Sequence, residues 1–312
     1  MNSQKHSFQN HVPFLVFSNS VKALACALAV LGTTQGASAA AISGNIAESF
    51  DYGTGVQFTT AGGPNGGVGW NGNAWGAVNT GGNQIYRTAT SPGLTFNAAG
   101  YFAGTGNKLT LDAATANQTQ NAGRAFGQTI NEGTTYFSLL MSKNNDTIRT
   151  INFAFFDGTT ERFAVGQIAT AAGNTAGNIG LLMNNSNPAG LIQNGTSPIA
   201  MGIGITHLIV GRIDWNTAGN ESVTLWVDPT DVTSEGAAGA AYLFTSGFEL
   251  TQLTGVRPFV GNTSAGFNAV SANFDEFRMG GDWVSVVPEP STLTLAGLGA
   301  IGLVVAMRRR KA

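Results

Sequence analysis

Short segments in which apolar and polar residues alternate recur between Ile42 and Val286 of this 312-residue chain. In Ser222 to Asp228 (SVTLWVD), Val or Leu occupies every second position, and Thr224, Trp226 and Asp228 fall on the opposite face, as in a half-buried strand. The pattern predicts further strands over Tyr136 to Met141, Thr150 to Phe156, Glu161 to Val165, Leu208 to Ile213, and Phe274 to Met279.

The segments between these strands favour tight turns. Asp157-Gly158 lies between two apolar runs and predicts a hairpin. The chain has 43 glycines and only 10% charged residues, which disfavours long surface helices, whereas 43% hydrophobic residues suffice for a core. Residues 169–180 and 233–241 are of low complexity and are predicted loops. We therefore expect an all-β, antiparallel sandwich, most simply as one domain.

In the body of the chain, residues 40–286, few side chains could support acid–base or thiol chemistry. Cys26, the single cysteine, lies in the N-terminal leader, and His207 is the one histidine beyond it. This excludes disulfides, thiol catalysis and cysteine-bound metals in the body. Between Ala40 and Pro288, nine Lys and Arg stand against sixteen Asp and Glu, a net charge of −7, which argues against a nucleic-acid partner.

The N-terminal segment is typical of a secretory signal peptide. Lys5 and Lys22 precede the apolar run Ala23 to Leu31, and small residues follow. We expect residues 1–39 to direct export and signal peptidase to cut after Ala39, in the Ala-Ser-Ala sequence. The apolar run is too short to remain as a spanning anchor.

The C-terminal segment has three parts in a fixed order. Val287, Pro288, Glu289 and Pro290 come first, the uncharged run Ser291 to Met307 follows, and Arg308, Arg309, Arg310 and Lys311 form a basic cluster. Seventeen uncharged residues are at the lower limit for a transmembrane helix. The basic cluster would stay in the cytoplasm and leave the body outside.

This ending, VPEPSTLTLAGLGAIGLVVAMRRRKA, resembles the sorting signal of PEP-CTERM proteins of Gram-negative bacteria. The resemblance implies that an exosortase, a membrane protease, recognises Pro288, Glu289 and Pro290 and cuts nearby. The helix would then be a temporary membrane anchor, and the mature protein would reach the cell surface or the medium. Residues 287–312 are thus expected to be a sorting signal.

Residues 40–286 in turn resemble LamG-like, concanavalin A-like jelly rolls. The resemblance rests on ESFDYGTG and GGVGWNGNAW near the start, on LIVGRIDW and ESVTLWVDPTD, and on FDEFRMGGDW near the end. It implies a jelly-roll sandwich. Because such sandwiches serve as lectins, hydrolases, adhesins and spacers, it implies no particular activity.

One motif suggests a nucleotide site but lacks the context for it. Gly67 to Gly72 (GVGWNG) fits G-x-G-x-x-G, but no helical pattern follows, so we interpret it as a glycine-rich turn. Trp70 and Trp75 in this region would stack on sugar rings if exposed, or otherwise pack in the sandwich.

The carboxylates do not form a recognisable catalytic pattern. No Glu-x-Asp-x-x-Glu sequence is present, and the adjacent Asp275 and Glu276 are expected to point to opposite faces of a strand. Glu276 and Arg278 share a face, which predicts an ion pair.

Calcium is the one cofactor with candidate ligands. Asp228 and Asp231, which flank a proline turn, could offer oxygens to Ca²⁺, as could Asp51 or Asp157; turn chemistry also explains them. His207 has no nucleophile motif around it and is interpreted as a hydrogen-bonded histidine at the start of a strand.

The sequence favours a non-enzymatic surface or matrix protein with a structural or adhesive role, associated with exopolysaccharide. Two alternatives stay open. One is a lectin-like module that binds glycans through Trp70, Trp75 or loop aspartates, and the other is a glycoside hydrolase.

Overall fold

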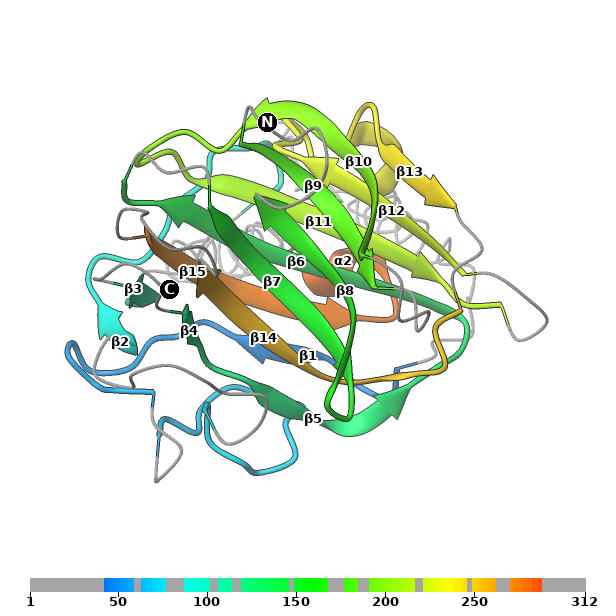
Figure 1. Ribbon diagram of the computed structural model, residues 1–312. Coiled ribbons are helices and arrows are strands. Elements are labelled where there is room, and N and C mark those ends of the chain that lie inside the picture. The colour runs from blue at the N-terminus through cyan, green and yellow to red at the C-terminus, as the bar shows by residue number, and fades with distance from the viewer. Residues whose placement is uncertain are drawn as a thin grey trace, which may run out of the picture. The chain divides into compact units, whose positions relative to one another are not determined.

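The computed structural model describes residues 42–58, 63–76, 87–101, 106–113, 119–145, 149–167, 177–184, 191–216, 221–245, 249–261 and 270–287. Within these residues the chain forms two antiparallel sheets that face each other as a sandwich (Figure 1). In the described part of the chain, helical structure is limited to two short turns, η2 (Glu235–Ala237) and α2 (Trp283–Val286). The predicted all-β sandwich is confirmed.

Eight strands form one sheet. Their order is β13 (Tyr242–Thr245), β12 (Ser222–Val227), β11 (His207–Asp214), β6 (Thr134–Lys143), β15 (Val270–Gly280), β3 (Lys108–Ala113) and β2 (Arg87–Thr90), and β1 (Ile46–Glu48) pairs with the end of β15.

Seven strands form the other sheet, which lies in front in Figure 1. Their order is β10 (Leu191–Ala200), β9 (Asn178–Asn184), β8 (Thr160–Gln167), β7 (Thr150–Asp157), β14 (Leu253–Gly261) and β4 (Thr119–Asn121), and β5 (Arg124–Ile130) also pairs with β14.

All six strands predicted from alternation are present, as is the turn at Asp157-Gly158 that joins β7 to β8. The loop predicted over residues 169–180 is wrong at its end, because β9 already begins at Asn178. There the apolar run that follows Asn178 continues the sheet beside β8.

The main core lies between the two sheets and is rich in phenylalanine. Phe155 stacks on Phe163 at 4.3 Å between ring centroids, and Phe153 stacks on Phe277 of the opposite sheet at 4.8 Å. Burial of such side chains is the principal favourable term in folding.

A second hydrophobic cluster covers the outer face of the eight-stranded sheet. Leu140, Leu208, Trp226 and Trp283 belong to it, and all are buried. Alternation in β12 therefore does not separate a buried face from an exposed one: Thr224 and Trp226 are only 5% and 4% exposed. The prediction that β12 is half-buried is wrong, because loops and α2 cover its second face.

Candidate functional site

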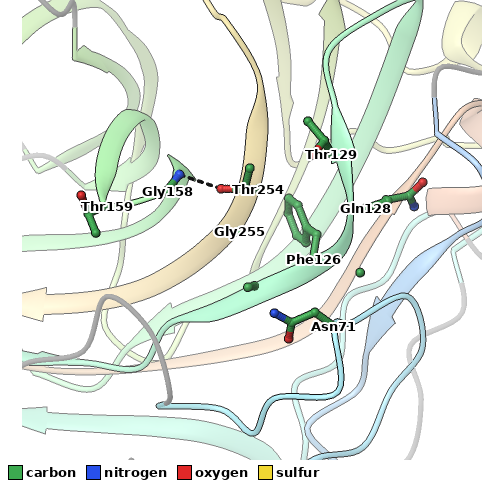
Figure 2. Close-up of a pocket in the computed structure, with 10 residues that line it drawn as sticks. Asn71, Phe126, Gln128, Thr129, Gly158, Thr159, Thr254 and Gly255 are labelled. Atoms are coloured by element: carbon green, nitrogen blue, oxygen red, sulfur yellow. Dashed lines mark hydrogen bonds between the residues drawn. The ribbon is translucent and has the colours of Figure 1, made fainter.

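A groove of about 600 Å³ lies on the seven-stranded sheet, beside the β7–β8 turn (Figure 2). We call it the β5 groove. It is lined by β5 from Ala125 to Thr129, by Gly158 and Thr159 of the turn, by Thr254 and Gly255 of β14, and by Asn71.

The groove is uncharged, and its wall combines apolar surface with polar side chains. Its lining residues include amide and hydroxyl side chains, and none of them is titratable. The amide of Gln128 is bonded to Ser43 and Gly44, so it is not available to a ligand in this conformation. Such a surface can exchange hydrogen bonds with a neutral, hydroxyl-rich ligand without the desolvation cost of a buried charge.

Glycines allow the chain to pass closely at the floor of the groove. A Cβ atom on Gly127 would lie 3.0 Å from the carbonyl oxygen of Trp70, and one on Gly255 would lie 2.7 Å from that of Arg124. The amide of Gly127 donates to the carbonyl of Gly69 at 2.8 Å, which holds the residue 69–71 turn against β5. The residue 69–71 turn and β14 therefore pack closely against β5.

Two hydrogen bonds of Thr254 hold the wall at the hairpin. The amide of Gly158 donates to Oγ1 of Thr254 at 2.7 Å, drawn as a dashed line in Figure 2, and the Thr254 hydroxyl donates to the carbonyl of Phe156. On the other side, the amide of Asn73 donates to Oδ1 of Asn71, which orients the Asn71 side chain. These bonds preorganise the rim.

Charged groups lie beyond the groove on β7, β8 and β14. Arg162 contacts Asp157 at 2.7 Å. Although burial opposes it, hydrogen bonds from Arg162 and Gln252 hold the pKa of Asp157 below its usual value. Arg257 pairs with Glu161 at 2.6 Å, and burial raises the pKa of Glu161. Each charge thus has a partner of opposite sign.

Beneath the turn that flanks the groove lies a buried ion pair. Oε2 of Glu48 accepts from Arg124 at 2.8 Å, from Nε1 of Trp75 at 2.6 Å and from the hydroxyl of Tyr52 at 2.7 Å. Burial and the Glu48 charge raise the pKa of Tyr52. Arg124 also donates to the carbonyls of residues 66 and 73. Its partners thus fix the glycine-rich turn to β5 and β1.

The structure places Trp70 and Trp75 together, 5.2 Å apart between ring centroids. Trp75 is completely buried, so a sugar ring has no access to it in this conformation. Trp70 is partly buried against the core, donates to the carbonyl of Ala47, and carries the Arg124 guanidinium 4.6 Å from its ring centroid.

The motif over Gly67 to Gly72 forms a turn. Gly67, Gly69 and Gly72 have φ values of 74°, 79° and 86°, a region that glycine adopts readily. No helix follows within the described residues after it, 73–76, which agrees with the interpretation as a turn.

The two aspartates proposed for calcium serve local hydrogen bonds. Oδ2 of Asp228 lies 2.7 Å from Nδ1 of His207, and its Oδ1 accepts from the amide of Leu208. Oδ1 of Asp231 accepts from the amide and hydroxyl of Thr233. Among the described residues, no group of three or more His, Cys, Asp or Glu side chains could hold a metal ion.

His207 begins β11 as predicted, and its ring is buried. Its Nδ1 has Asp228 as partner, whereas its Nε2 has none within the described part of the chain. The pair fastens the ends of β11 and β12 to each other.

The prediction that Asp275 and Glu276 point to opposite faces is wrong. β15 has a bulge between Asp275 and Arg278, and Glu276 has a φ of 48°. The extra residue shifts the alternation, so both carboxylates make their bonds away from the main core. Asp275 accepts from the amide of Leu94 at 2.7 Å, and Glu276 forms the predicted ion pair with Arg278 at 2.7 Å.

Burial raises the pKa of Asp275 to about 8, and the nearby Glu276 charge acts in the same direction. The buried hydroxyl of Tyr101 lies near this pair and has no hydrogen-bond partner within the described residues. Alternation alone could not show that Asp275 and Glu276 lie on the same face, because a bulge changes which residues share a face.

Comparison with known proteins identifies the C-terminal segment. Residues 286–311 match the model of the PEP-CTERM protein-sorting motif. The chain therefore carries the sorting signal that exosortases process, which implies export and a surface or extracellular destination. None of the curated proteins matches the sequence.

Solved structures with a similar fold include enzymes and lectins. An endo-β-1,4-glucuronan lyase from the fungus Trichoderma reesei is 14% identical, with a TM-score of 0.43 over 64% of this chain and 91% of its own. Alginate lyase Aly36B is 10% identical, with a TM-score of 0.46 over 75% and 96%. The lectin UEA-II is 12% identical, with a TM-score of 0.30 over 64% and 94%.

The described residues end at Val287. The predicted signal peptide, Pro288, Glu289 and Pro290, the apolar run and the basic cluster Arg308 to Lys311 lie outside them. In the part of the chain that is described, no helix is long and apolar enough to cross a membrane.

Proposed function

We propose that this chain is an exosortase-sorted surface or matrix protein whose body adheres to neutral segments of an extracellular polysaccharide through the β5 groove. The observation that carries the proposal is the uncharged, amide- and hydroxyl-lined groove on a body that bears a sorting signal. Signal peptidase removes the leader, and the C-terminal helix anchors the body until the exosortase cuts.

The role is structural or adhesive and not catalytic. A glycoside hydrolase would need two carboxyl groups about 5 to 9.5 Å apart across its substrate. No carboxyl group is among the residues that line the groove, and Asp157, on the adjacent hairpin, is engaged by Arg162 and Gln252. Calcium is not required for this role.

The β5 groove replaces Trp75 as the candidate glycan contact. Asn71, Thr129 and Thr159 supply the hydrogen bonds, and the apolar part of the wall packs against the sugar ring. A single groove of this kind gives weak binding, and many copies along one polymer would add avidity.

The test is calorimetric titration of the protein from its native cells with a panel of neutral and acidic polysaccharides. We expect at least one neutral glycan to bind with little dependence on salt, because no charge takes part. Thr129→Trp, which fills the groove, should abolish binding. Thr160→Trp, at the exposed start of β8 outside the groove, should not. Absence of binding to every glycan would refute the adhesive role.

A further inference from the structure

The folded body ends on a buried helical turn directly before the sorting motif. Oδ1 of Asp282 accepts from the amide of Ser285 at 2.8 Å, which caps α2, and the amide of Val287 donates to the carbonyl of Trp283 at 3.1 Å. Val286 and Val287 are only 0% and 1% exposed. The chain is therefore packed up to the residue that precedes Pro288.

Residues 283–287, which we call the C-terminal plug, lie on the outer face of the eight-stranded sheet. The Trp283 indole donates to the carbonyl of Val232 at 2.8 Å and packs edge-on against Trp226, 5.2 Å away between ring centroids. The Ser138 hydroxyl of β6 donates to the carbonyl of Val286. The plug thus contacts both central strands, β6 and β15.

This packing conflicts with what a protease needs. Proteases cut chain that is exposed or transiently opened, and for a segment in a folded domain the rate follows the population of the open state. Residues on the N-terminal side of a bond at Pro-Glu-Pro are those of the plug. In the docked state the side chains of Trp283, Val286 and Val287 are packed on the body, and the Val286 carbonyl accepts a hydrogen bond from it.

We propose that undocking of the C-terminal plug limits the rate at which the exosortase processes this protein. This inference rests on the proposed sorting of the chain. The plug is a single turn, so it can open without loss of the sandwich, as local unfolding does in other proteins. The plug can dock only when the outer face of the eight-stranded sheet is folded. Correctly folded molecules would therefore keep the C-terminal anchor longest.

The experiment follows processing in the native cells by pulse–chase, with intact mass to locate the new C-terminus. Trp283→Ala and Val286→Ala loosen the plug and should each accelerate processing, by more than about fivefold for Trp283→Ala. Val284→Ala is the matched control, because Val284 lies on the same turn but is 44% exposed, and its rate should match the parent.

A spacer variant keeps the plug intact. Six Gly and Ser residues inserted between Val287 and Pro288 supply about 20 Å of extended chain. We expect this variant to be processed faster than the parent, and Trp283→Ala should then add no further acceleration. It also guards against the case in which Trp283→Ala impairs folding of the body.

The outcomes separate the two proposals. If the parent, the plug variants and the spacer variant are processed at one rate, the plug does not limit the reaction, and this inference is wrong while sorting stands. If every form retains Ala312, the sorting proposal itself fails, and the plug has no reaction to limit. Faster processing of Val284→Ala to the same extent as Val286→Ala would also overturn the inference.

Discussion

The guanidinium of Arg124 lies 2.8 Å from the carboxylate of Glu48, and the two side chains are 1% and 2% exposed. β5 and β1 belong to different sheets and do not pair with each other. The ion pair therefore connects the two sheets at this point. The turn that carries Trp70 and Trp75 closes over it.

Removal of one partner of this pair should be costly. Glu48→Ala leaves a buried guanidinium without its counter-charge, and we expect a loss of about 3–5 kcal/mol in the free energy of unfolding. Urea denaturation measures it. Asp214→Ala is the control: it breaks the more exposed pair with Arg212, where the side chains are 30% and 37% exposed, and should cost no more than about 1 kcal/mol. Equal losses would contradict the structure.

Two glycines of the same turn should respond differently to alanine. Gly67 and Gly72 both have positive φ, so each substitution costs about 1–2 kcal/mol in backbone strain. A Cβ on Gly67 would also lie 2.3 Å from the carbonyl oxygen of Ala47, whereas a Cβ on Gly72 meets nothing within 4 Å. Gly67→Ala should therefore lower the thermal midpoint clearly more than Gly72→Ala, and the reverse order would be inconsistent with the described turn.

The free energy of unfolding should decrease as the pH rises, because Asp275 loses its proton. Its pKa of about 8 in the folded state lies above the ordinary value of 3.8, so between these values the folded state binds more protons than the unfolded state. The stabilising contribution is complete below about pH 4 and is lost as the pH rises through 8, on the order of a few kcal/mol in total. Urea midpoints at pH 5, 7 and 9 should fall less steeply in Asp275→Asn, and parallel profiles would show that Asp275 does not titrate there.

Thr254→Val tests the groove wall with little change in side-chain shape. It removes the acceptor for the Gly158 amide at the exposed turn, which should cost about 1 kcal/mol of stability or less. If the wall positions a glycan, the loss in binding free energy for the neutral polysaccharide should exceed the loss in the free energy of unfolding. Unchanged affinity in a calorimetric titration would place the ligand elsewhere.

The alternation of apolar residues was sufficient to predict six strands and their antiparallel class, because one face of each strand packs in the main core. It could not predict the bulge at Glu276, since the extra residue leaves no mark in composition. Nine of the fifteen described strands are not among those predicted. In one of them, β14, the sequence contains Pro258, a residue that disfavours a central strand. Pro258 fits where β4 ends and β5 has not yet begun, and its carbonyl accepts from the amide of Ala122.

The candidate site was less accessible to sequence reasoning than the fold. Residue type alone points to the tryptophans, yet Trp75 is buried against Phe50 and Phe58 and donates to Glu48, and these tertiary contacts leave no pattern in the local sequence. The β5 groove combines small and uncharged residues from four separate segments, none of which has a distinctive pattern. The sorting signal, in contrast, is contiguous and could be recognised directly.

The docking of α2 on β6 and β15 also determines how the body would bear mechanical load. Under the proposed anchoring and adhesion, drag on an attached polymer would pull the chain at Val287. The force reaches the single turn at Trp283 first and then β15, a strand hydrogen-bonded on both sides at the centre of its sheet. Such a protein would yield by release of a short, re-formable contact, and the sandwich would stay intact.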